Sequence, residues 1–252
     1  MNEITLFGFN NLTKSLSFSL YKLHYIGNQQ ERYNLFIKKR YSADKLNTVL
    51  TKLCNAIGGN VLNIAKQDYQ PQGASVTLMI SEESQVQPFA KTVPESIVAH
   101  LDKSHLCIHT YPEESPQNDI AIFRADIELS TCGVISPLKV LNHVIEAFDA
   151  DVIDIDYRIR GMTRDRRGKK LFNIDELSNL SDFLSTKVTQ CYNISEHDFH
   201  KQNLFHAKLR RKNITLNNYV FETSIEGLCD DEQRSIHSKL TEEIQQLFTN
   251  TN

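Results

Sequence analysis

The feature that most constrains the fold of this chain is a change of hydrophobic period along the sequence. Apolar residues alternate with polar ones over 16–20 and again over 152–159, which is the period of a strand with one buried face. Over 46–57 the spacing changes to three and four residues, as on the apolar face of a helix. Gly58-Gly59 ends this helix, since glycine adopts a left-handed cap at little cost. The sequence therefore predicts both strands and helices.

Other segments add elements without a strict alternation of strand and helix. Further strands are expected at 5–7, 61–64, 74–80, 97–101, 105–109 and 120–129, with a turn at 71–73 and an exposed loop at 82–95. Helices are expected from Ser136-Pro137 onward, at 175–188 and at 232–248, with a basic hairpin or loop tip at 164–170. We therefore predict an α+β fold, an antiparallel sheet layered with helices, rather than a parallel Rossmann sheet.

Composition argues against several classes of protein. The formal net charge is −3, so the chain lacks the basic excess typical of nucleic-acid binders. The five cysteines are scattered and contain no CxxC pair, so neither a structural zinc site nor a disulfide framework is expected. No apolar run approaches the roughly 18 residues that span a bilayer, and the start lacks the pattern of a signal peptide. We expect a cytoplasmic protein with no nucleic-acid or membrane partner.

The densest group of chemically active side chains lies between residues 96 and 132. Three of the nine histidines fall within ten residues of one another there. The group consists of Ser96, His100, Ser104, His105, Cys107, His109, Glu113 and Cys132. We therefore place the candidate active site in this stretch.

Residue types alone leave several interpretations of this group open. The histidines are structural if backbone carbonyls satisfy their imidazoles. His105, Cys107 and His109 share one face of a strand and could bind zinc or copper. A serine hydrolase would need a nucleophile elbow such as GxSxG, which the sequence lacks. A cysteine hydrolase that pairs Cys132 with His109 stays open on residue types.

A self-cleaving chain explains the whole group. Ser104 follows the carbonyl of Lys103 directly, and in a strained loop its hydroxyl can attack that carbonyl to form an ester. If His109 then removes the α-proton of Ser104, elimination cuts the chain and hydrolysis leaves a pyruvoyl group. Such a group is an electron sink for decarboxylation, and Cys132 suits the acid that afterwards returns a proton.

Several longer motifs occur in this sequence in a characteristic order. They are GFNNLTKSLSF at 8–18, NVLNIAKQDYQPQGASVT at 60–77, DKSHLCIHTYPE at 102–113, STCGVISP at 130–137 and IDYRIRGMTRD at 155–165. Together they resemble the pyruvoyl-dependent S-adenosylmethionine decarboxylases of the long bacterial type. The resemblance is close over 4–176 and loose beyond, and it implies a single domain over 1–252.

The resemblance implies where the chain is cut. Family members are cleaved before the serine of the KSH motif, which here is the bond between Lys103 and Ser104. The products would be a beta chain, 1–103, and an alpha chain, 104–252, that begins with the pyruvoyl group. Shorter members also use a hydroxyl eight residues before the pyruvoyl serine during processing, and Ser96 stands at that offset.

The reaction implied by the resemblance is decarboxylation of S-adenosylmethionine for spermidine biosynthesis. The substrate amine forms a Schiff base with the pyruvoyl group made from Ser104, CO₂ leaves, and Cys132 of the TCG motif returns the proton. His109 of the HTYPE motif is the proton acceptor in processing. Phe7 and Glu113 are candidate substrate-binding residues, because aromatic faces and carboxylates suit a sulfonium cation.

Cofactors and partners also follow from the resemblance. The covalent pyruvoyl group is the cofactor, and Mg²⁺ is implied as an activator because long bacterial members are stimulated by it. The sequence shows no ligand set for Mg²⁺, since Asp151, Asp154 and Asp156 are more simply the solvent face of a strand. Family protomers pair with two sheets stacked between outer helix layers. We expect a homo-oligomer of processed protomers, a dimer or a dimer of dimers.

A non-catalytic relative is the alternative function. Such a chain would bind S-adenosylmethionine or another partner without cutting itself. It would not need to keep Ser104, His109 and Cys132 together, and all three are present.

Overall fold

Long strands dominate the computed structural model, which describes residues 11–82, 103–113, 119–132, 135–165, 167–173, 177–221 and 225–251. The strands are β1 (Thr13–Tyr25), β2 (Gly59–Asp68), β3 (Ala74–Glu82), β4 (Lys103–Pro112), β5 (Ile120–Cys132), β6 (Val152–Arg160), β7 (Thr163–Arg164), β8 (Lys170–Leu171), β9 (Tyr192–Phe199) and β10 (Leu204–Arg211). The α-helices are α1 (Gln30–Arg40), α2 (Ala43–Ile57), α4 (Leu141–Phe148), α5 (Thr186–Cys191) and α6 (Asp230–Thr249). None of these helices is both long and apolar enough to cross a membrane.

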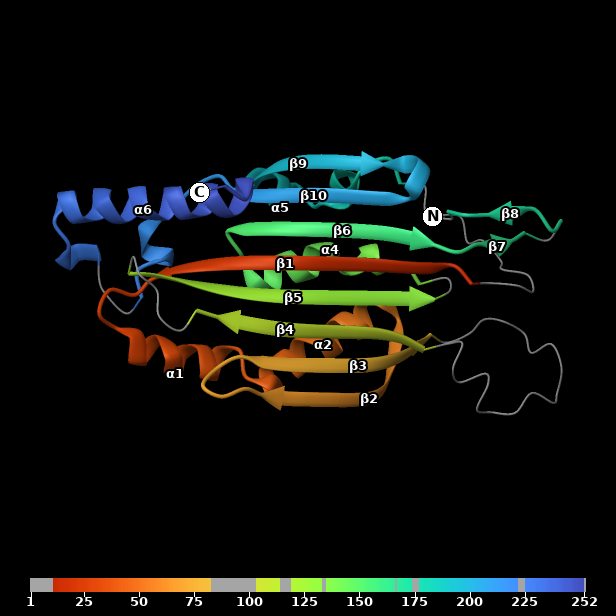
Figure 1. Cartoon of the computed structure of the whole chain (residues 1–252), viewed down its shortest axis with the longest axis horizontal. Helices are drawn as coiled ribbons and strands as arrows, with labels where there is room; N and C mark the ends of the chain where they lie inside the picture. Colours follow the sequence, from red (N-terminus) through yellow and green to blue (C-terminus); the bar gives the residue numbers. More distant parts are fainter. Residues whose placement is uncertain are drawn as a thin grey trace.

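Eight of the strands form one sheet in the order β2-β3-β4-β5-β1-β6-β10-β9 (Figure 1). Every neighbouring pair in this sheet is antiparallel. The short strands β7 and β8 pair separately as a hairpin that extends beyond the end of β6. The predicted α+β fold with an antiparallel sheet is therefore confirmed.

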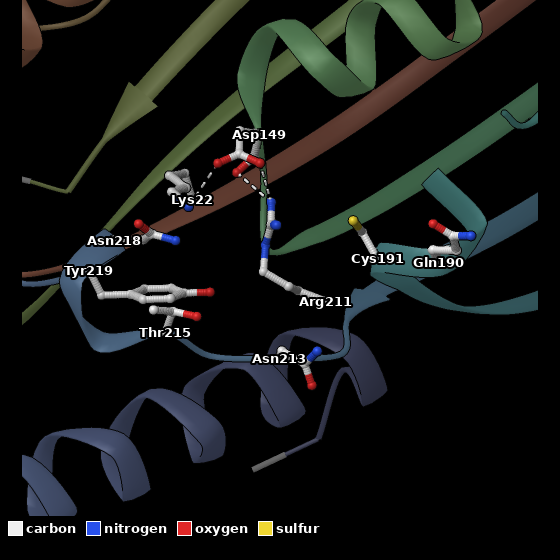
Figure 2. Close-up of a pocket in the computed structure, with 9 residues that line it drawn as sticks. All are labelled: Lys22, Asp149, Gln190, Cys191, Arg211, Asn213, Thr215, Asn218 and Tyr219. Atoms are coloured by element: carbon white, nitrogen blue, oxygen red, sulfur yellow. Dashed lines mark hydrogen bonds and ion pairs between the residues drawn. The ribbon is translucent and has the colours of Figure 1, made fainter. Parts of the chain in front are cut away.

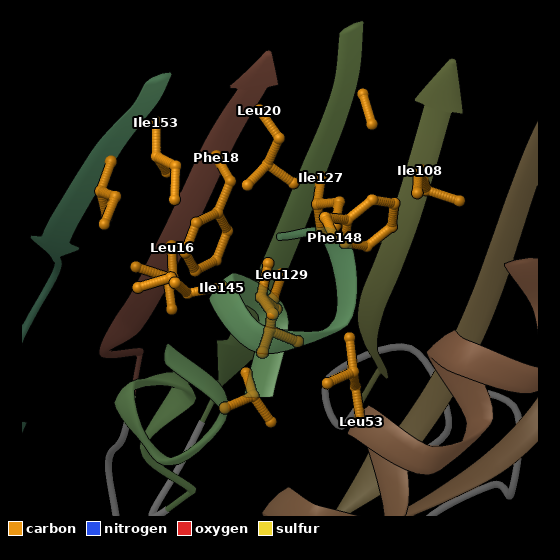
Figure 3. Close-up of a cluster of buried hydrophobic side chains, with 14 of the residues drawn as sticks. Leu16, Phe18, Leu20, Leu53, Ile108, Ile127, Leu129, Ile145, Phe148 and Ile153 are labelled. Atoms are coloured by element: carbon orange, nitrogen blue, oxygen red, sulfur yellow. The ribbon is translucent and has the colours of Figure 1, made fainter. Parts of the chain in front are cut away.

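One face of the sheet is covered by helices and carries the main hydrophobic core (Figure 3). On β1 this face presents Leu16, Phe18 and Leu20, each at most 2% exposed. They belong to one buried cluster with Leu53 of α2 and Phe148 of α4. Residues of α1 and α5 join the same cluster. The period of two in the sequence thus selects the face that receives the helices.

The opposite face of the sheet is polar over most of its width. Within the described chain, α6 packs on it at one end, where its Ile236 and Leu240 meet Leu23 of β1 and Val152 of β6 in a second, smaller core. We call the remainder of this side the open face. On β1 the open face consists of Thr13, Ser15, Ser17 and Ser19.

Several predicted elements are confirmed in detail. The helix expected over 46–57 is α2, whose first turn is capped by the Ser42 side chain and which ends at Gly58 with a φ of 82°. The helix expected from Pro137 is a 3₁₀ turn, Pro137–Val140, that continues as α4. The basic segment is the turn between β7 and β8. The strands expected at 5–7 and 97–101, and nearly all of the loop expected at 82–95, lie outside the described residues.

The helix predicted at 175–188 is wrong in extent. The described part of that segment contains a 3₁₀ turn, Leu180–Phe183, and then α5, which begins only after Ser185. Helix α1 and strands β9 and β10 were not predicted. The reason is clear in α1, where only Tyr33 and Ile37 are buried among polar neighbours, so its hydrophobic period is weak.

The solvent-face assignment of Asp151 is also wrong, because this residue is 0% exposed. Its carboxylate accepts hydrogen bonds from the Leu23 N–H at 2.8 Å and the Tyr219 hydroxyl at 2.7 Å. It also lies 3.3 Å from Lys22 Nζ and 3.2 Å from Arg211 Nε. A buried charge persists only when paired in this way. Asp151 therefore ties β1 to the segment that follows β10.

His24 is a buried base on β1 beneath helix α1. It is 8% exposed, and its ring lies against Tyr33 and Phe36. Burial, and secondarily the charge of Lys22, lowers its pKa to about 4. The folded chain therefore holds this imidazole neutral at pH values where the unfolded chain protonates it.

This difference predicts acid sensitivity. As pH falls from about 6.5 to about 4, His24 is protonated in the unfolded chain but stays neutral in the folded chain. The free energy of unfolding therefore falls by up to about 1.4 kcal/mol per pH unit. We expect His24→Phe to remove that part of the slope in urea denaturation measured across this range. His197→Phe, a change at an exposed histidine, should keep it. An unchanged slope in His24→Phe would contradict the assignment.

Candidate active site

Ser104 is the second residue of β4, and it is 1% exposed. Strand β4 lies between β3 and β5, and Ser104 pairs with Ile80 of β3. The Ser104 hydroxyl oxygen accepts a hydrogen bond from the backbone N–H of Cys132 at 3.1 Å. The bond between Lys103 and Ser104 therefore lies at the beginning of a paired strand, which starts two residues before the strand expected at 105–109.

Cys132 is the last residue of β5 and is partly exposed. It stands opposite Thr13, the first residue of β1. Its Sγ lies 3.7 Å from Thr13 Oγ1, within the range of a hydrogen bond to sulfur. Cys132 therefore contacts both neighbouring strands. Its backbone N–H contacts Ser104 on β4, and its thiol contacts Thr13 on β1. The structure brings Ser104 and Cys132 together as the sequence suggested.

His109 shares β4 with Ser104 but does not lie beside it. Side chains alternate along a strand, so Ser104 points toward the covered face with the buried Leu106 and Ile108, whereas Cys107 and His109 point to the open face. The five-residue offset corresponds to about 16 Å at roughly 3.3 Å per residue. The expectation that His109 is near Ser104 is therefore wrong within a single chain.

The backbone at the candidate cleavage site is regular. Lys103 and Ser104 both belong to β4, and neither is among the described residues with a positive φ. The loop strain expected from the sequence is not found in this conformation. What the site provides instead is a hydroxyl with a fixed direction, because the N–H of Cys132 restrains it. The same N–H would stabilise negative charge that develops on that oxygen.

The predicted substrate-binding residues do not gather around Ser104 in the described chain. Glu113 follows the far end of β4, nine residues from Ser104 or about 30 Å along a strand. Its carboxylate accepts the Ile122 N–H at 3.0 Å, and its own N–H donates to the Ile122 carbonyl at 2.9 Å, so it closes the β4–β5 connection. Ser96 and Phe7 lie outside the described residues.

The metal and hydrolase interpretations gain no support from this geometry. His105, Cys107 and His109 do share the open face, but the described residues contain no group of three or more His, Cys, Asp or Glu that could hold a metal ion. Burial raises the pKa of the Cys107 thiol, which favours its neutral form. His109 pairs with Asp126, which is six residues or about 20 Å from Cys132 along β5, too far for a catalytic pair within the chain.

A row of hydroxyls on β1 borders the site and was not assigned from the sequence. Ser15 Oγ lies 3.4 Å from Ser130 Oγ and also accepts a hydrogen bond from Arg160 at 3.4 Å. Further along, Ser19 donates to Asp126 at 2.8 Å. The period of two in TKSLSFS signals that these hydroxyls share a face, but only the register shows what stands opposite each of them.

Two polar cavities in the described chain are not lined by Ser104 or Cys132. One, of about 220 Å³, is bordered by Lys22, Asp149 and Arg211, whose side chains converge there (Figure 2). The other, of about 320 Å³, lies on the open face beside the end of α6. Cationic and anionic groups in both are already paired, since Lys22 Nζ lies 3.8 Å from Asp149 in the first and Lys208 Nζ lies 3.3 Å from Asp154 in the second. Neither cavity therefore replaces Ser104 and Cys132 as the candidate site.

Sequence comparison finds close relatives over the whole chain. A family model described as S-adenosylmethionine decarboxylase matches residues 33–161, which contain Ser104, His109 and Cys132. An S-adenosylmethionine decarboxylase proenzyme of Pseudoalteromonas translucida (strain TAC 125) is 46% identical over 260 residues, which cover 100% of this chain and 96% of that protein. A protein of the same name from Escherichia coli (strain K12 / DH10B) is 45% identical over 261 residues and covers 100% and 98%.

A solved structure resembles the chain less closely. The adenosylmethionine decarboxylase from Aquifex aeolicus vf5 is 15% identical, with a TM-score of 0.38 over 68% of this chain and 98% of that one.

Proposed function

The chain belongs to the S-adenosylmethionine decarboxylase family, and we propose that it is a self-processing enzyme that removes CO₂ from S-adenosylmethionine. The product would be decarboxylated S-adenosylmethionine, the aminopropyl donor for spermidine. One observation carries the assignment of the site: the Ser104 hydroxyl is held by the N–H of Cys132, whose thiol stands free of that contact. The candidate nucleophile and the residue that carries the candidate acid are therefore neighbours on adjacent strands, joined through the Cys132 backbone.

We assign chain cleavage to the Ser104 hydroxyl. Attack of its Oγ on the carbonyl carbon of Lys103 breaks the peptide C–N bond and forms an ester, while the released nitrogen takes up a proton. Loss of the α-proton of residue 104 then expels the carboxylate of Lys103, so that 1–103 and 104–252 become separate chains. Water replaces the nitrogen of residue 104, which leaves as ammonia, and a pyruvoyl group remains. The Cys132 N–H at 3.1 Å supports the first step by directing Oγ.

The residues around position 104 fit such a group. A pyruvoyl group supplies a carbonyl that condenses with an amino group and withdraws electrons from the bond to the departing carboxylate. Cys132 lies on the neighbouring strand β5 with its backbone N–H bound to the Ser104 hydroxyl, and we assign to its thiol the return of a proton to the α-carbon. In the uncut chain this thiol and the Ser104 side chain point to opposite faces. Cleavage makes residue 104 a chain terminus, which frees it to turn toward the thiol.

His109 requires a second copy of the chain in this proposal. Within one chain it lies about 16 Å from Ser104 and faces the open side, so it cannot take up the α-proton of that serine. The open face is where a second protomer would stack in the arrangement implied by the family resemblance. We therefore assign the proton-acceptor role to His109 contributed by one protomer to the cleavage site of the other. A homodimer, or a dimer of such dimers, follows from this assignment.

Three further assignments stay predictions. Mg²⁺ as an activator follows from the resemblance alone, since the described residues offer no group of three or more ligand side chains. The roles of Phe7 in substrate binding and of Ser96 in processing also stay predictions from the resemblance.

Variants of Ser104 and Cys132 separate the two steps. Ser104→Ala removes the nucleophile, so we expect one uncut chain without decarboxylase activity. Cys132→Ala keeps the backbone N–H that holds Ser104, so we expect it to cut itself but to lose turnover by about 10²–10⁴-fold, as for other positioned proton donors. Intact mass and release of CO₂ from carboxyl-labelled S-adenosylmethionine measure the two effects.

The matched control for these variants is Cys191→Ala, which changes an exposed cysteine at the end of α5 and should leave cutting and turnover intact. Full turnover in Cys132→Ala would reject the role of the thiol. A wild-type preparation that stays uncut and inactive under all conditions would instead favour a non-catalytic relative.

Mixed oligomers test whether His109 acts on the neighbouring protomer. Alone, His109→Ala should stay uncut, because its own copies lack the proton acceptor. Co-expressed with Ser104→Ala chains, which carry His109 but cannot be cut, the His109→Ala chains should be cleaved. Distinct affinity tags and intact mass identify which chain is cut. A Ser104→Ala, His109→Ala double variant is the control partner and should give no rescue. If the His109→Ala chain is cut alone, or is never rescued, the two-protomer assignment fails.

A further inference from the structure

We propose that Thr13 is the positioning residue for the Cys132 thiol, holding its sulfur so that the S–H points at the substrate. The inference rests on the proposed role of Cys132 as proton donor and extends it to a residue far away in the sequence. Thr13 and Cys132 are 119 residues apart and meet because β1 and β5 pair in register.

Strand pairing on both sides of β1 fixes the contact between Thr13 and Cys132. Thr13 Oγ1 lies 3.7 Å from Cys132 Sγ, and the two residues are direct cross-strand partners. On its other side Thr13 pairs with Arg160 of β6, so β1 is held by both neighbours at this point. Threonine is also branched at Cβ, which restricts its side-chain rotation. The position of the Thr13 hydroxyl relative to the sulfur is therefore restricted both by the backbone and by the side chain.

The hydrogen-bond partner of the Cys132 thiol comes from β1, not from β4. The backbone N–H of Cys132 is already engaged by the Ser104 hydroxyl on β4. A cysteine side chain has three staggered rotamers, and a half-buried thiol at a strand end needs a contact to select one of them. The Thr13 hydroxyl lies within hydrogen-bonding range of the sulfur and can make this selection.

The chemistry fixes the direction of that hydrogen bond. A thiol that gives its proton to a carbon must keep its S–H free for that carbon, so the Thr13 hydroxyl acts as donor and the sulfur as acceptor. When the proton has moved to the α-carbon, the sulfur carries a negative charge. The same O–H then donates to a thiolate, and hydrogen bonds to charged groups are stronger than those to neutral ones. Thr13 therefore stabilises the state of the enzyme after proton transfer more than the state before it.

Two variants of Thr13 test this role through turnover. Thr13→Val keeps the shape but removes the hydroxyl, so we expect kcat to fall about 10-fold or more with KM nearly unchanged. Thr13→Ser restores the hydroxyl and should recover most of the loss. Ser17→Ala is the matched control, because it removes another open-face hydroxyl of β1 that lies opposite Glu128 and Asp156 instead of Cys132. It should leave kcat unchanged.

A second readout does not depend on decarboxylation at all. In the uncut Ser104→Ala chain, alkylation of Cys132 by iodoacetamide at fixed pH is followed by peptide mass spectrometry, with the exposed Cys191 as internal reference. Loss of a donor to the thiolate lowers the amount of thiolate more than it raises thiolate reactivity. Adding Thr13→Val to this chain should therefore slow alkylation of Cys132 about threefold or more relative to Cys191, and Thr13→Ser should not.

The outcomes are distinguishable. Slower alkylation together with a lower kcat and rescue by Thr13→Ser supports the proposal. Unchanged alkylation, an unchanged kcat, or failure of Thr13→Ser to rescue overturns it. If Cys132→Ala keeps full turnover, the proposed function of the thiol fails, whereas the alkylation experiment still decides whether Thr13 holds the sulfur.

Discussion

The pairing of β1 with β5 on one side and with β6 on the other is the contact on which the rest of the molecule depends. It joins the half of the sheet that carries the candidate cleavage site, β2-β3-β4-β5, to the half formed by β6-β10-β9. It also sets both faces at once, because Leu16 and its even-numbered neighbours enter the core while the hydroxyls point outward. A slip of one residue would exchange the two faces and would separate Thr13 from Cys132.

The alternation of side chains on β4 has a direct consequence for the chemistry. Ser104 and His109 are separated by an odd number of residues, so a regular strand places them on opposite faces. A single chain can therefore hold the Ser104 hydroxyl by the Cys132 N–H, yet its regular β4 does not bring His109 to the same point. The family resemblance assigns roles to residues without saying which copy supplies each one. The distance along β4 is the reason for proposing that two protomers share the processing site.

An element could be predicted from the sequence where its hydrophobic period and its capping residues were clear. Helix α2 has Ser42 before it, a repeated apolar stripe and Gly58 after it, and all three were readable in the sequence. Helix α1 buries only two residues and has no such pattern, so it was missed. Asp151 was misassigned because a carboxylate next to a strand is usually solvated. Its burial depends on Lys22, Arg211 and Tyr219, which come from distant segments and cannot be paired with it by inspection of the sequence.

The sequence by itself determined the fold class, the family and the identity of Ser104, His109 and Cys132 as candidates, because these depend on periodicity and on motifs that are local in the chain. Only the tertiary structure decided that the Ser104 hydroxyl meets the N–H of Cys132, that Thr13 meets its thiol, and that His109 stands apart from both. These relations depend on the register between strands, which brings together residues that are 28 and 119 positions apart in the sequence. Register is set by the packing of the whole sheet, so no local pattern reports it.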